Sequence, residues 1–141
     1  MSQEPTLQEL VSPLRQLVEK LILEHHTFAD QNEVLVRTAA DSDMVTPEMY
    51  QLLSSLRDGL MQHIVEEESK IYPDLKRRNQ FDNLVAMIMQ QHEELKASLR
   101  QIEAALDARD TEALRDALTL FTEILSVHQP AEEDVVFPMV E

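Results

Sequence analysis

The chain has 141 residues, which is enough for one domain with a hydrophobic core of its own. Its 27 acidic residues outnumber 12 basic ones, and the formal net charge of −15 argues against nucleic acid or an anionic membrane surface as a partner. The absence of cysteine excludes disulfides, thiolate metal ligands and cysteine nucleophiles.

The amino-terminal stretch MSQEPTLQEL lacks the basic region and apolar core of a secretion signal. No later stretch approaches the roughly 20 apolar residues that a membrane span requires. We therefore expect a cytoplasmic protein that has no membrane partner.

A single glycine and an aromatic content of 4% argue against hairpins and sheets, which need glycine in tight turns and aromatic residues in strands. The chain is therefore predicted to be all-α. The first helix has Ser12 as its N-cap and Pro13 at its first position, or it starts earlier at a capping box over residues 6–9. It is expected to run to about Ala40.

Proline residues mark the limits of the later helices. The second helix begins with Pro47 at its first position and is expected to stop at Pro73. A third helix covers roughly residues 80–107, and a fourth covers residues 111–137 and ends at Pro138. Four helices of similar length with short polar links predict an antiparallel up-down four-helix bundle.

One histidine-containing segment occurs twice in the chain. HIVEEESKIYP at residues 63–73 returns as HQPAEEDVVFP at residues 128–138. The matched pairs are His63 and His128, Glu67 and Glu132, Glu68 and Glu133, Ile71 and Val136, Tyr72 and Phe137, and Pro73 and Pro138.

The repeat extends towards the amino terminus of each half. LEHHTF around His25 resembles MQQHEEL around His92, because each has a large apolar side chain three residues after the histidine. All five histidines of the chain fall inside this pattern. We therefore expect one domain over residues 1–141, built from two pseudo-repeats at about 12–73 and 80–138.

The spacing of histidine and glutamate in this repeat is typical of a metal site. Residues four apart lie on one helix face and can reach a single ion, and mixed imidazole and carboxylate ligands suit iron, manganese or zinc. The histidines lie on or beside the apolar stripes, so they are expected to converge inside the bundle. Buried carboxylates are costly unless they are paired or bind metal, and two ions bridged by Glu67 and Glu132 would offset that cost.

The order of these motifs resembles the hemerythrin HHE cation-binding family over nearly the whole chain. In both, a histidine is followed by His-x-x-x-Glu with an aromatic-Pro tail, and the pattern then repeats. The resemblance implies a four-helix bundle with two iron ions bridged by oxo, hydroxo or water, with histidines as terminal ligands and glutamates as bridges. The positions that match the family's ligands are His25 or His26, His63, Glu67, His92, His128 and Glu132.

The chain also departs from particular relatives. Oxygen-carrying hemerythrins are similar to it but have a further histidine in the third helix, where Lys96 stands, which implies a more open metal. Bacterial iron–sulfur repair proteins with a similar bundle share the adjacent histidines of the first helix, but no cysteine here matches their cysteine-bearing segment. Among the other residues, Glu68 and Glu133 are candidate outer partners of the ligand histidines, while Tyr72 and Phe137 are interpreted as packing residues at helix ends.

Two ligand assignments stay open at this point. Neighbours on a helix lie about 100° apart, so His25 and His26 cannot both point into one site, and helical phase favours His25. Pro130 predicts a kink near residue 126, and a broken helix there would leave Glu133 as the substitute for Glu132.

Two classes of function follow from such a site. The first is a metal-binding module that reversibly binds oxygen or nitric oxide for sensing, storage or delivery. The alternative is a di-iron enzyme in nitric oxide or peroxide detoxification, or in iron–sulfur cluster repair. No sequence feature indicates a substrate pocket with converging polar groups, so the first class is favoured.

Overall fold

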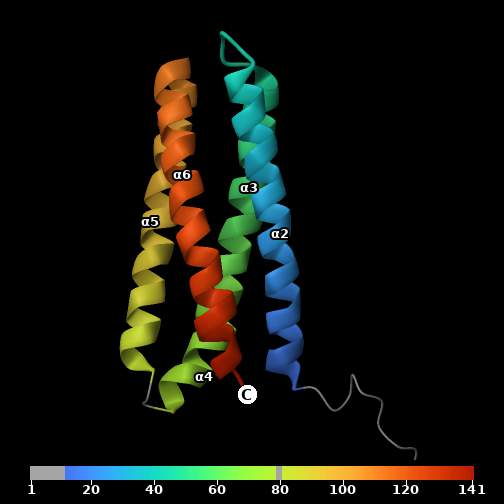
Figure 1. Ribbon diagram of the computed structural model, residues 1–141, viewed down its shortest axis with the longest axis vertical. Coiled ribbons are helices and arrows are strands. Elements are labelled where there is room, and N and C mark those ends of the chain that lie inside the picture. Colours follow the sequence, from blue (N-terminus) through green and yellow to red (C-terminus); the bar gives the residue numbers. More distant parts are fainter. Residues whose placement is uncertain (1–11, 79–80) are drawn as a thin grey trace, which may run out of the picture.

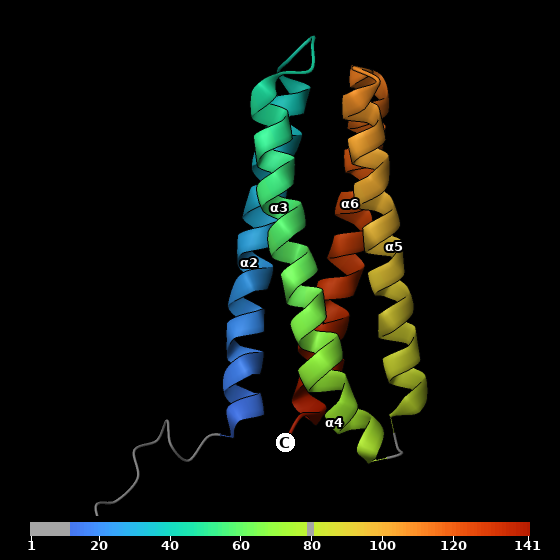
Figure 2. The ribbon, with the colours of Figure 1, turned by 180° about the vertical axis from the view of Figure 1, so that it is seen from behind.

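The computed structural model describes residues 12–78 and 81–141, which form an antiparallel four-helix bundle (Figure 1). Helix α2 runs from the end of the bundle that carries the carboxyl terminus to the opposite end, α3 returns, and α5 and α6 repeat this path, as both views show (Figure 2). The predicted all-α class and up-down topology are confirmed. The long helices are α2 (Pro13–Ala40), α3 (Pro47–Glu66), α5 (Asp82–Asp107) and α6 (Thr111–Ala131).

The starts of α2 and α6 are set by capping side chains. The Oγ of Ser12 accepts a hydrogen bond from the backbone N–H of Arg15 at 3.1 Å, which satisfies one of the free donors of the first turn of α2. Asp110 caps α6 in the same way through the N–H of Ala113 at 3.0 Å. Of the two predicted starts of the first helix, Ser12 is therefore confirmed, and the capping box over residues 6–9 lies outside the described residues.

The predicted stop of the second helix at Pro73 is wrong. Helix α3 passes into a short π-helix, η1 (Glu67–Ile71), and then into α4 (Tyr72–Arg77), with Pro73 in the first turn of α4. Proline is tolerated there because the N–H that it lacks would have no partner inside the new helix.

The fourth helix also passes into a π-helix and then into a further short helix. Helix α6 keeps Pro130 inside it and passes into the π-helix η2 (Glu132–Val136), which is followed by the 3₁₀-helix η3 (Phe137–Met139). The helix therefore does not break before Glu132, and Glu133 is not needed as its substitute.

The core consists of two apolar clusters that lie one above the other along the bundle. One cluster includes Phe28 of α2 and Leu95 of α5, and it fills the half nearest the α2–α3 and α5–α6 links. The other includes Leu21 and Ile88 from the same two helices, and it fills the half next to α4. The two clusters are separated by a layer of buried polar side chains.

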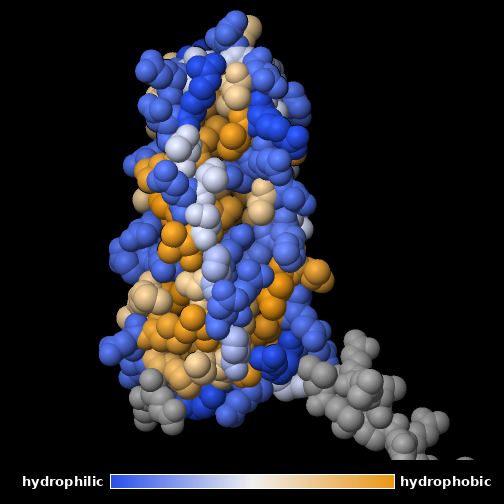
Figure 3. Space-filling view, in the orientation of Figure 1, coloured by the Kyte–Doolittle hydropathy of each residue, from blue (hydrophilic) through white to orange (hydrophobic). Residues whose placement is uncertain are grey.

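Apolar side chains are also present on the surface. Figure 3 shows them gathered over the halves of α5 and α6 that lie nearest α4. The large exposed apolar residues of α5, α6 and η2 are Met87, Leu120, Val127 and Val135. Within residues 12–78 and 81–141, no helix has both the length and the apolar character of a membrane span.

Two leucines of α2, two positions apart, test the placement of the core. Leu21 is fully buried, whereas 68% of Leu23 is exposed. Leu21→Ala is expected to lower the free energy of unfolding of the metal-free protein by about 2–5 kcal/mol, because it removes buried methyl groups and leaves a cavity. The matched change Leu23→Ala is expected to cost less than about 0.5 kcal/mol. Urea unfolding followed by circular dichroism measures both free energies of unfolding. Equal losses in the two variants would contradict the burial of Leu21.

Candidate metal centre

The polar layer between the two apolar clusters contains four histidines and two glutamates, all at most 2% exposed. They come from all four long helices and from the first residues of both π-helices. Their donor atoms form two groups, each within 4.8 Å, that have both glutamates in common. The groups are His25, His63, Glu67 and Glu132, and Glu67, His92, His128 and Glu132.

Glu132 contacts histidines of both groups. Its Oε1 lies 2.8 Å from Nε2 of His128 and 3.1 Å from Nε2 of His25. Its Oε2 lies 3.6 Å from Nε2 of His92. One carboxylate therefore faces both halves of the layer, as a bridging ligand must.

Glu67 occupies the matching place on the other side of the layer. Its Oε1 lies 3.2 Å from Nε2 of His63 and 3.4 Å from Nε2 of His92, so it also faces both groups. His26, by contrast, is exposed and belongs to neither group. The structure thus brings together His25 and the other five sequence-predicted side chains and leaves His26 outside, while the ligand roles themselves stay predictions.

Both glutamates occupy the first position of a π-helix. The wider π turn ends where the N–H of Tyr72 bonds to the carbonyl of Glu67, and the N–H of Phe137 bonds in the same way to the carbonyl of Glu132. A proline follows each aromatic residue and cannot donate to the carbonyl four residues back. The repeated aromatic-Pro tail thus coincides with a local unwinding of the helix, a feature that is frequent at functional sites.

Three of the four histidines of the layer, all except His25, have a hydrogen-bond partner on their other ring nitrogen. The Nδ1 of His63 lies 2.8 Å from Glu24, and the Nδ1 of His128 lies 2.9 Å from the side-chain oxygen of Gln91. Because oxygen atoms of this kind accept hydrogen bonds, Nδ1 carries the hydrogen, and in the neutral ring Nε2 keeps the lone pair that a metal needs.

Of the two outer partners suggested by the sequence, Glu68 makes a hydrogen bond and Glu133 does not. Glu68 lies 2.8 Å from Nδ1 of His92, and Glu133 lies 3.7 Å from Nδ1 of His25. Sequence reasoning missed Glu24 and Gln91, although a signal was present: each directly precedes a histidine at the same place in the repeat.

The hydroxyl of Tyr72 is a further functional group that the sequence interpretation missed. Tyr72 is buried and donates a hydrogen bond to Oε2 of Glu132 at 2.6 Å, while its oxygen lies 3.2 Å from Nε2 of His92. Burial and the nearby charges of Glu132 and Glu67 raise the pKa of Tyr72 well above its ordinary value. The phenol therefore remains protonated and is a hydrogen-bond donor inside the layer.

Contacts inside the layer separate the pKa values of the two glutamates. Burial and the neighbouring Glu132 raise the pKa of Glu67 well above its ordinary value. Burial alone would raise the pKa of Glu132 too, but its contacts with Glu67 and with the histidines lower it well below the ordinary value. In the metal-free layer Glu67 therefore holds a proton more readily than Glu132 does.

The layer contains polar atoms that a metal ion would satisfy. Both side-chain oxygens of Glu67 and the Nε2 of His63 are buried and make no hydrogen bond. Such unsatisfied acceptors are costly in a core, and a cation bound between them would remove that cost. The residues present therefore fit a centre with two metal ions.

The only glycine of the chain supports the same layer. A Cβ at Gly59 of α3 would lie 3.1 Å from Cε1 of Phe28, tighter than an ordinary contact. The ring of Phe28 in turn packs edge-on against His63, with ring centroids 5.1 Å apart. Glycine at this position lets α3 approach Phe28 closely and leaves His63 in place.

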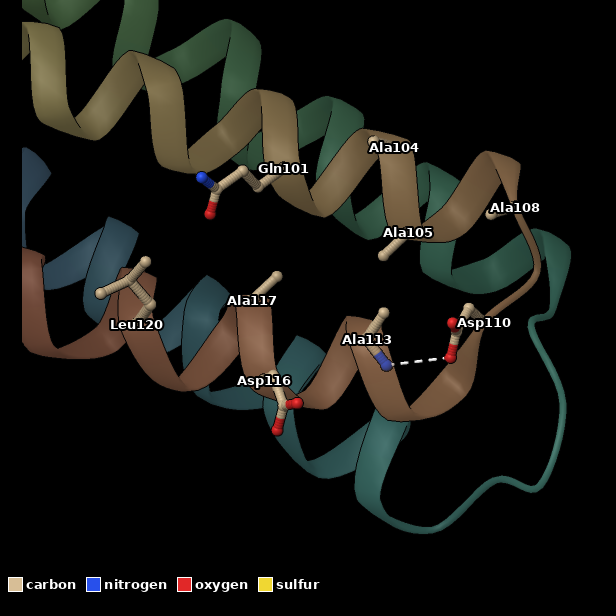
Figure 4. A pocket seen from close by; sticks show the side chains of 9 residues that line it. All are labelled: Gln101, Ala104, Ala105, Ala108, Asp110, Ala113, Asp116, Ala117 and Leu120. Carbon is tan, nitrogen blue, oxygen red and sulfur yellow. Dashed lines mark hydrogen bonds between the residues drawn. The ribbon is translucent and has the colours of Figure 1, made fainter.

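A groove of about 520 Å³ lies elsewhere, between α5 and α6 at the end opposite α4 (Figure 4). Five of its lining residues are alanines, and Asp110 at its end is already bonded to the backbone of Ala113 as the cap of α6. The groove contains no histidine, and its shape follows from small side chains. It is lined by Gln101, Ala104, Ala105, Ala108, Asp110, Ala113, Asp116, Ala117 and Leu120.

Comparison with protein families decides what this layer represents. The model of the hemerythrin HHE cation-binding domain matches residues 16–141. The chain belongs to this family. Searches of the curated proteins and of the solved structures found no match. The protein is thus a hemerythrin-like cation-binding domain with buried histidine and glutamate groups able to hold metal.

The adjacent histidines of α2 provide a direct test of the candidate ligands. His25→Ala is expected to lower the metal content by about one ion per chain, because it removes a buried donor from one of the two groups. His26→Ala changes an exposed neighbour and is expected to leave the metal content unchanged. Metal analysis after dialysis measures both, and the reverse result would give the ligand role to His26.

The pH dependence of the metal-free protein tests the charges in the layer. Burial alone would lower the pKa of His92, but its contacts with Glu132 and Glu67 raise it to about 10. A histidine with a raised pKa stabilises the fold fully below its unfolded pKa of about 6.5, and this contribution is lost as the pH rises through 10. The free energy of unfolding is therefore expected to fall between pH 7 and pH 10, and less steeply in His92→Gln. Equal slopes for the two proteins in urea titrations would contradict this account.

Proposed function

We propose that the protein binds two iron ions in this layer and uses them to bind a diatomic molecule, oxygen or nitric oxide, reversibly for sensing, storage or delivery. The observation that carries the proposal is the pair of four-residue groups that share Glu67 and Glu132. Two carboxylates common to both groups suit two neighbouring cations, and mixed imidazole and carboxylate donors suit iron, with manganese or zinc as alternatives.

Different side chains of the layer would hold the two ions. His25 and His63 would bind one ion, His92 and His128 the other, and the two glutamates both. Iron supplies the exchange of electrons with a small ligand when it is bound. Each ion would receive two imidazoles and an oxygen from each glutamate, which leaves room for a small ligand beside these donors.

The surroundings of the layer suit a small uncharged ligand. The apolar clusters on both sides exclude water, and the protonated hydroxyl of Tyr72 is a hydrogen-bond donor among the candidate ligands. Four grooves on the described part of the chain are lined by none of the six candidate ligands.

The competing function is that of an enzyme which consumes nitric oxide or peroxide, or which acts in iron–sulfur cluster repair. The same centre would serve both functions, so turnover is what separates them. The cytoplasmic location and the absence of nucleic acid and membrane partners stay predictions.

Exposure of the iron-loaded protein to gas tests the proposal. Ferrous protein mixed with oxygen or nitric oxide is expected to give a stable change in the visible spectrum that reverses when the gas is removed. The zinc-loaded protein, with the same fold and no redox chemistry, is the matched control and is expected to give no change. Continuous consumption of many equivalents of nitric oxide or peroxide would instead show that the protein is an enzyme.

A further inference from the structure

The two groups of candidate ligands are related by the internal repeat. The first position is the group that contains His25 and His63, and the second position is the group that contains His92 and His128. In the repeat, His25 matches His92 and His63 matches His128. An exact repeat would therefore give two metal positions with equal surroundings.

The repeat is broken at one outer partner. Glu24 lies 2.8 Å from Nδ1 of His63, whereas its counterpart Gln91 lies 2.9 Å from Nδ1 of His128. A carboxylate on Nδ1 makes the imidazole a stronger metal ligand than a neutral amide does. This difference favours the first position.

The repeat is broken a second time at the aromatic residue after each π-helix. The hydroxyl of Tyr72 donates to Oε2 of Glu132, the oxygen that faces His92. Its counterpart Phe137 packs on the ring of His25, with centroids 5.8 Å apart, and has no hydroxyl. The hydrogen bond withdraws negative charge from the oxygen that faces His92, and the hydroxyl also lies 3.2 Å from Nε2 of that histidine, so Tyr72 weakens mainly the second position.

The other outer groups act in the opposite direction. Glu68 lies 2.8 Å from Nδ1 of His92 and accepts its hydrogen bond, whereas Glu133 lies 3.7 Å from Nδ1 of His25, which makes no hydrogen bond. Lys20 lies 3.7 Å from Glu24, but half of the lysine side chain is exposed, and water screens such a pair. Each position thus has one hydrogen-bonded outer carboxylate, and the direct contact between Tyr72 and the candidate ligands of the second position decides the difference.

We propose that the two metal positions are unequal and that the first position binds metal about tenfold or more tightly than the second, the range found when outer partners of metal ligands differ. The first position fills first, and the second exchanges its metal. This inference rests on the proposed two-metal centre. It assigns Glu24, Gln91 and Tyr72 as positioning residues that set the order of loading.

Calorimetric titration of the metal-free protein with zinc tests this inference without any gas chemistry. Zinc is expected to bind in two steps whose dissociation constants differ by about tenfold or more. Gln91→Glu adds the missing carboxylate, and Tyr72→Phe removes the competing hydrogen bond. Each change is therefore expected to strengthen the weaker binding step and to reduce the difference between the two dissociation constants. Glu24→Gln is expected to weaken the tighter step by about tenfold.

Matched variants separate these effects from a general loss of charge. Glu68→Gln makes the same chemical change as Glu24→Gln but beside His92, so it is expected to widen the gap rather than narrow it. Glu93→Gln changes an exposed carboxylate that pairs with Lys96 and is expected to leave both steps unchanged. Equal constants in the unmodified protein, or the same shift in all of these variants, would overturn the inference.

Removal of one ligand from each position identifies the step to which it belongs. His92→Ala is expected to retain the tighter step, and His25→Ala is expected to retain the weaker one, with helix content checked by circular dichroism. The opposite assignment would overturn the inference. Because zinc titration does not depend on oxygen or nitric oxide, failure of the diatomic-ligand proposal would leave these results intact.

Discussion

The burial of two carboxylates in the middle of a helical bundle is the constraint on which the rest of the structure depends. Glu67 and Glu132 are fully buried, between apolar clusters that offer no water to solvate a charge. Four histidines face them, and three of these histidines have a hydrogen-bond partner on the other ring nitrogen. The helices, the π turns and the outer hydrogen bonds all serve to keep these polar groups together in a core that would otherwise exclude them.

Much of the fold and the composition of the layer could be predicted from the sequence because both are encoded in local periods. Helical phase places His25 inward and His26 outward, and the i to i+4 spacing brings His63 and Glu67 to one face. The prediction that the second helix stops at Pro73 was wrong because proline also occurs in the first turn of a new helix, and α4 begins there. Gln91 precedes His92 as Glu24 precedes His25, but it was missed because its contact with His128 depends on how α5 packs against α6.

The internal repeat explains how a short chain builds a site with two related halves. One helical hairpin supplies two histidines and one carboxylate, and the second hairpin supplies the same set from the opposite side. Neither hairpin completes a four-residue group alone, because each group takes a carboxylate from both. Differences between the hairpins, such as Tyr72 and Phe137, then act on one half of the centre without changing the architecture of the other.

The division of the apolar core into two clusters has a mechanical consequence. Helical bundles commonly open from their ends, where residues lack neighbours on one side. Here packed apolar side chains fill both halves of the bundle, so we expect a weak cross-section of the metal-free chain at the polar layer, where the π turns begin and buried acceptors lack partners. Amide hydrogens there would exchange with solvent before those of the flanking turns. A bound metal pair would then act as a crosslink between four helices and make the two clusters unfold as one unit.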